Sequence, residues 1–251
     1  MVTLLSLVFS SMFIFWVISQ CVKNPGIVDI YWPFAFVLIA FYFWTINPNP
    51  SIYNLLAKLC ILSWGFRLFT FLLITRVLPY HVEKRYDKLL KSKYYSFPIQ
   101  MLFQFLTQVC LILIIATPIY FITSQPITEL TILFIVGISL SIIGIIGETI
   151  TDFQLFWYRE NDVEHVCKVG LWRYSRHPNY FFDCLVWFGF SLIAMNVEYG
   201  YIALVSPLML LYIMLVITIP VTESYSLAKR PKEYLRYQKE TSKIVPWFRS
   251  H

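Results

Sequence analysis

The sequence predicts an all-α, multi-pass transmembrane bundle of about seven helices. Of its 251 residues, 58% are hydrophobic and only 14% are charged, a composition that is unusual for a water-soluble domain. The apolar residues also form successive runs, each long enough to cross a membrane as a helix of about 20 residues. The expected spans are 2–20, 28–46, 52–75, 99–123, 128–157, 178–198 and 201–220. Since they leave no stretch for a soluble domain, we expect a single membrane domain over residues 1–251.

The basic residues predict the orientation of these spans. Nearly all of them lie in four places: Lys23, 76–97, 158–177 and Lys229–Arg249. The alternate connections carry none: 47–51, 124–127 and 196–200. By the positive-inside rule, the N-terminus lies outside and the C-terminus is cytoplasmic. The net charge of +6 then reflects orientation, and no nucleic-acid partner is expected.

Several spans have ends that can be explained from the sequence. The first lacks a basic leader and a small-residue cleavage site, which indicates a retained helix and not a signal peptide. The second opens with Asp29, a capping residue, and with aromatic belt residues at 31–32. The sixth and seventh are joined by a short connection, as expected for antiparallel neighbours. The tail after Glu223 mixes aromatic and basic residues, which predicts a helix lying on the membrane surface.

The fifth span carries acidic and basic residues on one side. Glu148, Asp152 and Arg159 fall within an arc of about 40° of an α-helix. Ionisable groups inside spans mark either function or buried ion pairs. A ligand site is favoured here because two acids and one arginine leave charge unbalanced, and a salt-bridged stripe between helices is the alternative. Arg67, deep in the third span, also needs a partner, most simply Glu148, Asp152 or Asp183.

The segment 170–183, GLWRYSRHPNYFFD, which we call the entry segment, begins the sixth span. Pro178 is suited to the first helical position, which leaves free N–H groups and the positive end of the helix dipole facing the basic residues before it. Such a place can hold a phosphate at a membrane surface. The alternative is a basic flank that only orients the helix. That alternative does not explain Asn179 and Asp183, which lie one turn apart inside the helix.

Other known sites are not indicated by the sequence. The five cysteines are scattered, which predicts neither a disulfide framework nor a metal site. No Gly-rich phosphate loop, dinucleotide fingerprint, zinc-protease motif or nucleophile elbow is present. Any nucleotide would therefore bind between helices, through side chains and a helix end.

These motifs together resemble the steroid 5-alpha-reductase superfamily, which includes sterol C14 reductases and isoprenylcysteine carboxyl methyltransferases. The resemblance rests on ETITDFQLFWYR (148–159), the entry segment, Glu223 and the closing YLRYQKETSKIVPWF. DIYW (29–32), the segment around Arg67 and EKRY (83–86) are similar to the bacterial 5-alpha-reductase-like branch, grouped as DUF1295.

The resemblance implies a helical bundle that encloses NADPH in its cytoplasmic half. It divides the chain into N-terminal helices with a cytoplasmic loop (1–97) and a cofactor-binding part (98–251). Asn179 and Asp183 would lie near the nicotinamide, and Arg173, Arg176 and His177 near the phosphates. The full set of implied NADPH-binding residues is Arg85, Glu148, Asp152, Arg159, Arg173, Tyr174, Arg176, His177, Asn179, Asp183 and Glu223.

The implied activity is oxidoreduction of a CH–CH group, with hydride transfer from NADPH to the β-carbon of an enone in a steroid-like or other lipid. The Gln–Glu pair that activates the substrate in steroid reductases is missing from the first three spans. Asp29, Tyr31 and Arg67 are the candidates to take its place. Two alternatives stay open: an S-adenosylmethionine-dependent methyltransferase acting on a lipid or prenyl-type acceptor, and a non-catalytic member. A bacterial inner membrane is favoured over the endoplasmic reticulum, and the oligomeric state is not indicated.

Overall fold

A computed structural model describes residues 2–48, 51–79, 95–162 and 164–248. This part of the chain is helical and contains no β-strand, which confirms the predicted fold class. The long helices are α1 (Val2–Val22), α2 (Ile27–Ile46), α3 (Ile52–Leu72), α5 (Phe97–Ile115), α7 (Ile132–Asn161) and α8 (Pro178–Ala194). The shorter ones are η1 (Leu73–Val77), α6 (Thr117–Ser124), η2 (Gly170–Arg173), η3 (Gly200–Leu204), α9 (Val205–Ile213), η4 (Met214–Thr218), α10 (Ile219–Lys229) and α11 (Pro231–Glu240).

Six helical stretches in the described residues are long and apolar enough to cross a membrane, and the last of them runs continuously over Gly200–Lys229. The sixth predicted span is α8, whose 17 residues reach about 25 Å. The prediction of one helix over 99–123 is wrong in detail. The helix is interrupted at Ala116 and continues as α6, because Pro118 has no N–H to continue the backbone hydrogen bonds of α5.

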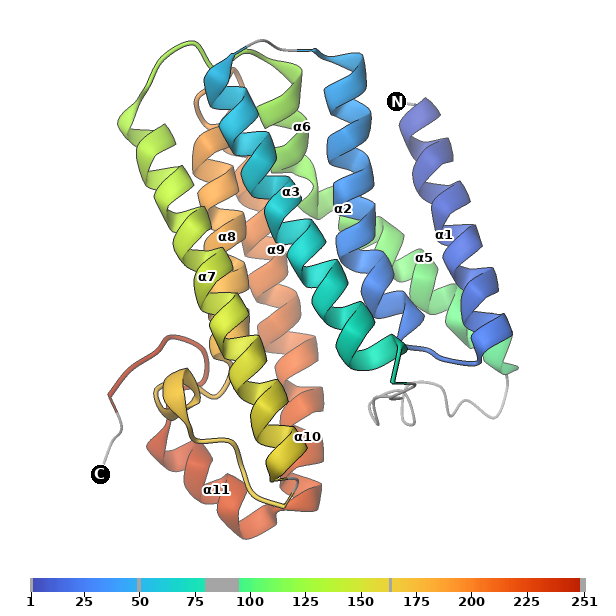
Figure 1. Ribbon diagram of the computed structural model, residues 1–251, viewed down its shortest axis with the longest axis vertical. Helices are drawn as coiled ribbons and strands as arrows, with labels where there is room; N and C mark the ends of the chain where they lie inside the picture. The colour runs from blue at the N-terminus through green and yellow to red at the C-terminus, as the bar shows by residue number, and fades with distance from the viewer. Residues whose placement is uncertain (1, 49–50, 80–94, 163, 249–251) are drawn as a thin grey trace.

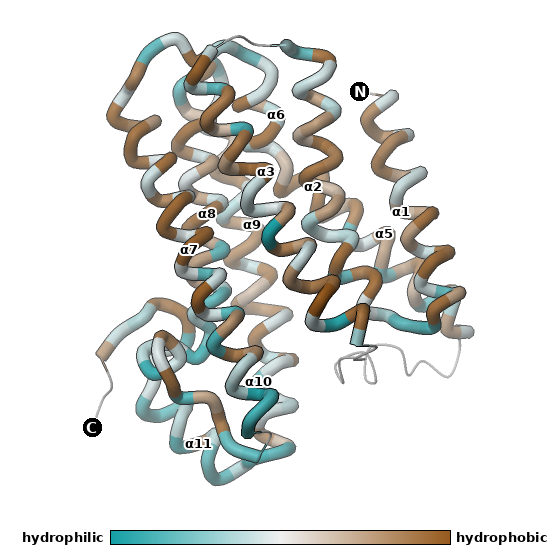
Figure 2. Tube along the Cα trace, viewed as in Figure 1, coloured by the Kyte–Doolittle hydropathy of each residue, from teal (hydrophilic) through white to brown (hydrophobic). Residues whose placement is uncertain are grey.

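The ends of the helices fall into two groups (Figure 1). The links from α2 to α3 and from α6 to α7 lie at one end of the bundle, while α10, α11 and the segment between α7 and α8 lie at the other. Hydrophobic residues dominate the helices between these ends, and hydrophilic residues concentrate around α10 and α11 (Figure 2). The basic stretches within the described residues thus share one end of the molecule, as the alternation of charged connections requires.

Small residues allow α7 and α8 to pack with their backbones almost in contact. A Cβ atom added at Gly144 would lie 2.8 Å from the carbonyl oxygen of Phe182, and one added at Gly189 would lie 2.6 Å from that of Gly137. Within a membrane, such close approach of small residues is a principal source of helix association. The pairing fixes the height of α8 against α7, and so the position of every side chain between them.

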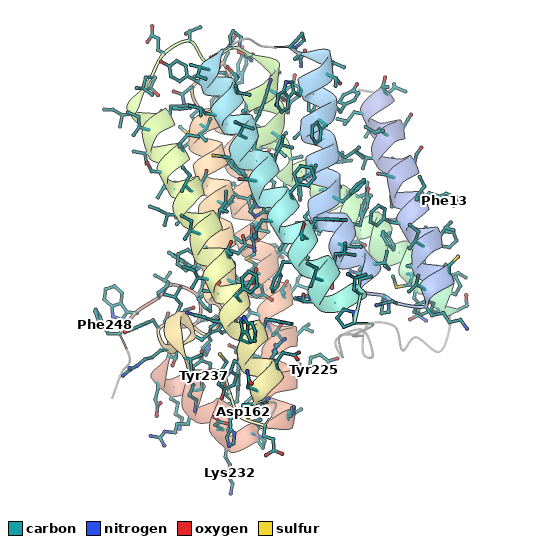
Figure 3. All side chains as sticks on the ribbon, in the orientation of Figure 1. Phe13, Asp162, Tyr225, Lys232, Tyr237 and Phe248 are labelled. Atoms are coloured by element: carbon teal, nitrogen blue, oxygen red, sulfur yellow. The ribbon has the colours of Figure 1, made fainter. Side chains whose placement is uncertain are left out.

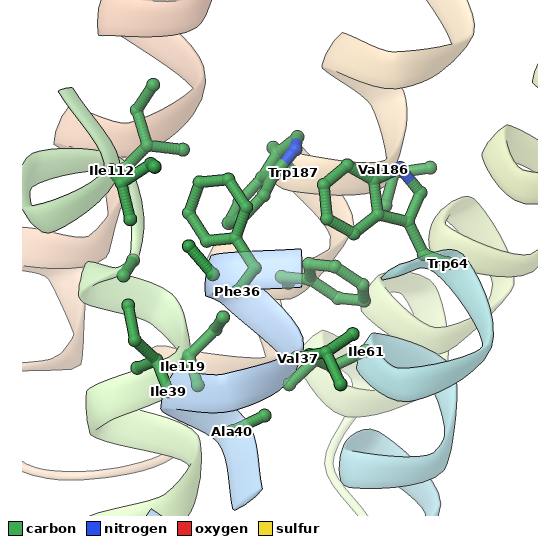
Figure 4. Packing of buried hydrophobic residues seen from close by; sticks show 14 of the residues in the cluster. Phe36, Val37, Ile39, Ala40, Ile61, Trp64, Ile112, Ile119, Val186 and Trp187 are labelled. Carbon is green, nitrogen blue, oxygen red and sulfur yellow. The ribbon is translucent and has the colours of Figure 1, made fainter. Parts of the chain in front are cut away.

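An aromatic cluster fills the middle of the bundle where α2, α3 and α8 meet (Figure 4). Phe36, Trp64 and Trp187 are completely buried, and their ring centroids lie between 4.7 and 5.7 Å from one another. Tilted and edge-on rings at these distances pack favourably and leave little room for water.

The end of the chain folds back under the bundle. Tyr234 and Tyr237 of α11 are buried against Val166, and the Tyr237 hydroxyl donates to the backbone carbonyls of Trp172 and Ser175 at 2.5 and 3.1 Å. Figure 3 shows Tyr237 on the bundle side of α11 and Lys232 pointing away. The aromatic face of α11 therefore packs against the protein itself, while the prediction that the tail lies on the membrane surface stays a prediction.

Candidate functional site

Three helices bring polar side chains, three of them acidic, to one buried place. We call it the acid cluster: Arg67 of α3, Glu148 and Asp152 of α7, and Asn179 and Asp183 of α8. Arg67 forms ion pairs with both acids of α7. Its Nη1 lies 2.7 Å from Asp152 Oδ2, and its Nη2 contacts Glu148 Oε2. Trp64 Nε1 also donates to Glu148 Oε2 at 3.2 Å. The prediction that Arg67 pairs with an acid of this group is confirmed.

The two α8 residues complete the cluster. Asn179 is a side-chain neighbour of Asp152, and Asp183 is an electrostatic neighbour of Arg67 and Asp152. Asn179 Oδ1 and Asp183 Oδ1 are buried and accept no hydrogen bond of ordinary geometry from a described residue, although the indole groups of Trp64 and Trp187 lie near the Asp183 carboxyl. A buried acceptor without a donor costs about 1–3 kcal/mol, so these two atoms mark a place suited to a ligand that carries donors.

The cluster contains more acid than base. Glu148, Asp152 and Asp183 contribute three carboxyl groups, and Arg67 contributes one guanidinium. Glu148 is 4% exposed and Asp183 is 9% exposed. Such an imbalance is costly inside a bundle and is typical of functional groups. No three His, Cys, Asp or Glu side chains among the described residues are placed to hold a metal ion.

The packing of α7 on α8 positions the cluster. Glu148 follows directly after Gly147, where an added Cβ would collide with the Phe182 ring. The glycines let the acids of α7 face Asn179 and Asp183 across a short gap. One turn deeper on α8, Trp187 closes the other side together with Trp64, and both indoles neighbour the Asp183 carboxyl. Aromatic rings thus border the cluster on the side of α8 that lies deeper in the bundle.

Arg159 continues the same face of α7 beyond the cluster, as predicted. It is exposed and forms no ion pair with a described residue. The three charged residues on this face of α7 therefore do not form one group, since Glu148 and Asp152 pair with Arg67 and not with Arg159. The alternative of a salt-bridged stripe between helices is confirmed for Glu148 and Asp152, which Arg67 joins to α3, whereas Asp183 neighbours Arg67 without forming an ion pair with it.

Part of the entry segment is engaged in a second polar group, which we call the tail clasp: Arg176, His177, Glu223 and Gln238. Arg176 Nε lies 2.9 Å from Glu223 Oε1, and Arg176 Nη1 donates to the carbonyl of Gln238 at 2.7 Å. His177 Nε2 lies 3.1 Å from the same Glu223 oxygen, and Gln238 Nε2 donates to Glu223 Oε2 at 2.7 Å. Burial lowers the pKa of His177, although its contact with Glu223 opposes that shift.

Three of the residues that the resemblance assigns to NADPH contact one another and the tail in this structure. They are Arg176 and His177, expected near the phosphates, and Glu223. Their cofactor-binding roles stay predictions. Arg176 N also donates to the Ser242 carbonyl at 2.9 Å, and Ser175 Oγ donates to that of Ile244 at 2.6 Å. These hydrogen bonds join the entry segment to the C-terminal tail. They are needed because backbone N–H and C=O groups outside the helix must find partners elsewhere.

Two further predicted NADPH-binding residues of the entry segment, Arg173 and Tyr174, lie at the surface. The Tyr174 ring packs edge-on against Phe248, near the end of the tail. Arg85, which was predicted to bind NADPH, lies outside the described residues.

Two of the three predicted catalytic residues lie outside the acid cluster. Asp29 forms an ion pair with Arg76 of η1 at 2.8 Å. Tyr31 is completely buried, and its hydroxyl donates to the Val8 carbonyl of α1 at 2.9 Å. The prediction that Tyr31 activates a substrate finds no support in this geometry, because its hydroxyl proton is already committed to α1. Arg67 alone of the three belongs to the cluster.

Sequence reasoning missed the partners that shape the site. Trp64 and Trp187 were not distinguished from other apolar residues of their spans. Gly137, Ser141 and Gly144 also went unnoticed, although their spacing of four and three residues is a signal of close helix packing that the sequence does contain. The pairing of Asp29 with Arg76 had no such signal, because it joins residues 47 positions apart.

A scan of protein families places the chain. A family model described as a protein of unknown function, DUF1295, matches residues 15–241. The chain belongs to this family. In this DUF1295 protein, the match covers every residue of the acid cluster and of the tail clasp. No curated protein and no solved structure matches it.

Proposed function

We propose that this DUF1295 protein is a membrane-embedded, NADPH-dependent reductase of a conjugated C=C bond in a lipid or steroid-like substrate. The observation that carries the proposal is the acid cluster, with the buried acceptors Asn179 Oδ1 and Asp183 Oδ1 beside the start of α8. The DUF1295 family is generally grouped with the steroid 5-alpha-reductase-like superfamily, which supports the same class of chemistry.

The residues present fit the reactive end of NADPH. A carboxamide NH₂ and ribose hydroxyl groups are hydrogen-bond donors, and they match the two acceptors that lack one. Arg159 and Arg173 are exposed cations at the end of the bundle where α7 ends and α8 begins, and they would hold the phosphates. Arg176 is not needed for this purpose, since it is held by Glu223.

The chemistry that bound NADPH supplies is a hydride, whose departure leaves positive charge on the nicotinamide ring. The surplus carboxylates of the acid cluster would stabilise that positive charge. Phe36, Trp64 and Trp187 would exclude water from the reacting atoms.

Arg67 is the residue best placed to activate an enone. Its Nε is buried and donates to no described residue, while Glu148 and Asp152 hold the guanidinium in place. As the hydride reaches the β-carbon, the electron pair of the C=C bond moves toward the carbonyl oxygen. A hydrogen bond from Arg67 Nε would stabilise the resulting enolate, and a proton from the solvent would then be added at the α-carbon.

A methyltransferase using S-adenosylmethionine is the second candidate. The excess of acid over base in the cluster would also suit a sulfonium cation, and the same acceptors would bind ribose hydroxyls. This ligand has no phosphate, so it would leave the exposed Arg159 without a group to bind.

Thermal unfolding of the detergent-solubilised protein with NADPH, NADP⁺, NADH or S-adenosylmethionine tests the proposal. At a ligand concentration of 100 times Kd, stabilisation of about 2.7 kcal/mol is expected. NADPH should raise the melting temperature, Asn179→Ala and Arg159→Ala should abolish the rise, and Arg236→Ala on the exposed face of α11 should leave it unchanged.

Stabilisation by S-adenosylmethionine alone would overturn the reductase in favour of the methyltransferase. If no ligand stabilises the protein at saturation, the non-catalytic alternative replaces both. For the location of the protein, we propose a bacterial inner membrane, which fractionation of the native cells would test.

A further inference from the structure

A groove of about 670 Å³ lies on the outer face of α7, away from the acid cluster. Apolar side chains form most of it, chiefly Ile150, Phe153 and Trp157, which are 44%, 47% and 63% exposed. Its other wall comes from the segment that follows the helix, at Val169. Exposed aromatic and aliphatic side chains on a spanning helix meet lipid, so the occupant of this groove belongs to the membrane.

The groove lies where α7 leaves the hydrocarbon. The helix has 30 residues and is about 45 Å long, whereas the hydrocarbon core spans about 30 Å. Counting about 20 residues from Ile132 places the boundary near Thr151, so Trp157 lies at headgroup depth. Exposed Ile143 and Ile146 extend the same apolar stripe toward the N-terminus of α7, so an acyl chain can lie along them.

The polar end of the groove is negatively charged. Asp162 lines it, and hydrogen bonds fix this carboxylate in place: the backbone N–H groups of Glu164 and His165 donate to Oδ1 at 3.0 Å, and the Tyr158 hydroxyl donates to Oδ2 at 3.1 Å. The His165 ring nitrogen Nδ1 also lies 3.1 Å from Oδ1 and 3.0 Å from Oδ2. These bonds, first the backbone bond from His165, lower the pKa of Asp162 to about 2, so the group is ionised. Asp162 also caps the C-terminus of α7, where the helix dipole adds negative charge.

Three features therefore favour a cationic headgroup at this depth. The Asp162 carboxylate and the helix end attract positive charge, and Trp157 and Tyr158 offer aromatic faces to an ammonium. This combination is unlike the basic stretches that elsewhere occupy this end of the bundle.

We propose that the groove binds an ethanolamine phospholipid, with the ammonium beside Asp162 and one acyl chain along Ile150 and Phe153. The site is separate from the acid cluster, because the lining residues face outward on α7 whereas Glu148 and Asp152 face α3. The inference does not depend on the proposed reductase activity.

Native mass spectrometry of the full chain in detergent tests the proposal, with phosphatidylethanolamine and phosphatidylglycerol of identical acyl chains as probes. We expect apparent binding of the ethanolamine lipid about threefold to tenfold tighter, as cation–π and exposed charge interactions of about 0.7–1.4 kcal/mol give. Asp162→Asn keeps the shape of the groove and should reduce the preference to less than about twofold.

Two further variants make the test specific. Glu160→Gln removes the same charge from a position that does not line the groove, and should keep the preference. Trp157→Ala should weaken both lipids, whereas Phe13→Ala on the lipid-facing side of α1 should weaken neither. Tighter binding of phosphatidylglycerol, or an equal loss of preference in Glu160→Gln and Asp162→Asn, would overturn the proposal.

Discussion

The acid cluster and the tail clasp look alike in the sequence but differ in how their polar atoms are satisfied. Both combine carboxylates with an arginine, and both involve the entry segment. In the tail clasp, Glu223 is contacted by Arg176, His177 and Gln238. In the acid cluster, Arg67 serves two acids, and acceptor atoms of Asn179 and Asp183 have no donor in the described residues.

This difference separates a structural group from a functional one. A buried polar network whose members are satisfied stabilises one arrangement of the chain. A network with acceptors left over keeps a free energy cost that a ligand can remove on binding. Variants in each group, and in the residues packed around them, test whether this distinction holds. They follow from the largest expected effect to the smallest.

Replacing Arg67 by Met should have the largest effect. The acids of α7 would lose their only described counter-ion, and an uncompensated buried charge costs about 3–5 kcal/mol. Unfolding in denaturant should show this loss relative to the wild type. Combining Arg67→Met with Glu148→Gln and Asp152→Asn should restore most of it, and an unchanged stability in the single variant would contradict the ion pairing.

The Glu223→Gln variant should destabilise the protein by about 2–3 kcal/mol, because hydrogen bonds from Arg176 and His177 would lose their charged acceptor. The melting temperature would fall, but the increment produced by NADPH would stay the same. Normal stability combined with a lost NADPH response would instead return Glu223 to the nucleotide site, as the sequence suggested.

Adding a methyl group with Gly144→Ala should cost about 1–2 kcal/mol and weaken NADPH binding. The new Cβ would lie 2.8 Å from the Phe182 carbonyl, so α8 must move away from α7 and carry Asp183 with it. Thermal unfolding with and without NADPH measures both effects. Ile143→Ala is the matched control, because the side chain of this neighbouring residue is exposed. It should change neither the stability nor the binding of NADPH.

The smallest effect is expected for Tyr31→Phe. Loss of the hydrogen bond to the Val8 carbonyl should cost about 1 kcal/mol, with no change in the NADPH response or in turnover. Turnover assays on an enone lipid would reveal any catalytic role. A large loss of turnover at near-normal stability would show that Tyr31 reaches the substrate after all.

The sequence identified the members of the acid cluster because charge inside an apolar run is conspicuous. Glu148 and Asp152 stand out on one face of a predicted helix, and Asp183 and Arg67 are isolated in their spans. Their mutual pairing could be proposed for the same reason, since so few partners exist at that depth. Arg176, His177 and Glu223 were equally conspicuous, but nothing in their spacing revealed that they bind one another.

By itself, then, the amino-acid sequence determined the helical fold, the rough limits of most long apolar helices, and the residues that must find a partner in an apolar environment. These follow from hydrophobicity and from the cost of burying charge, which act on each segment separately. Only the tertiary structure decided which partner each charge has, where α5 ends, and which acceptors stay without a donor. Those outcomes depend on how closely α7 and α8 approach at their glycines and on how the tail folds under the bundle, and no single segment contains that information.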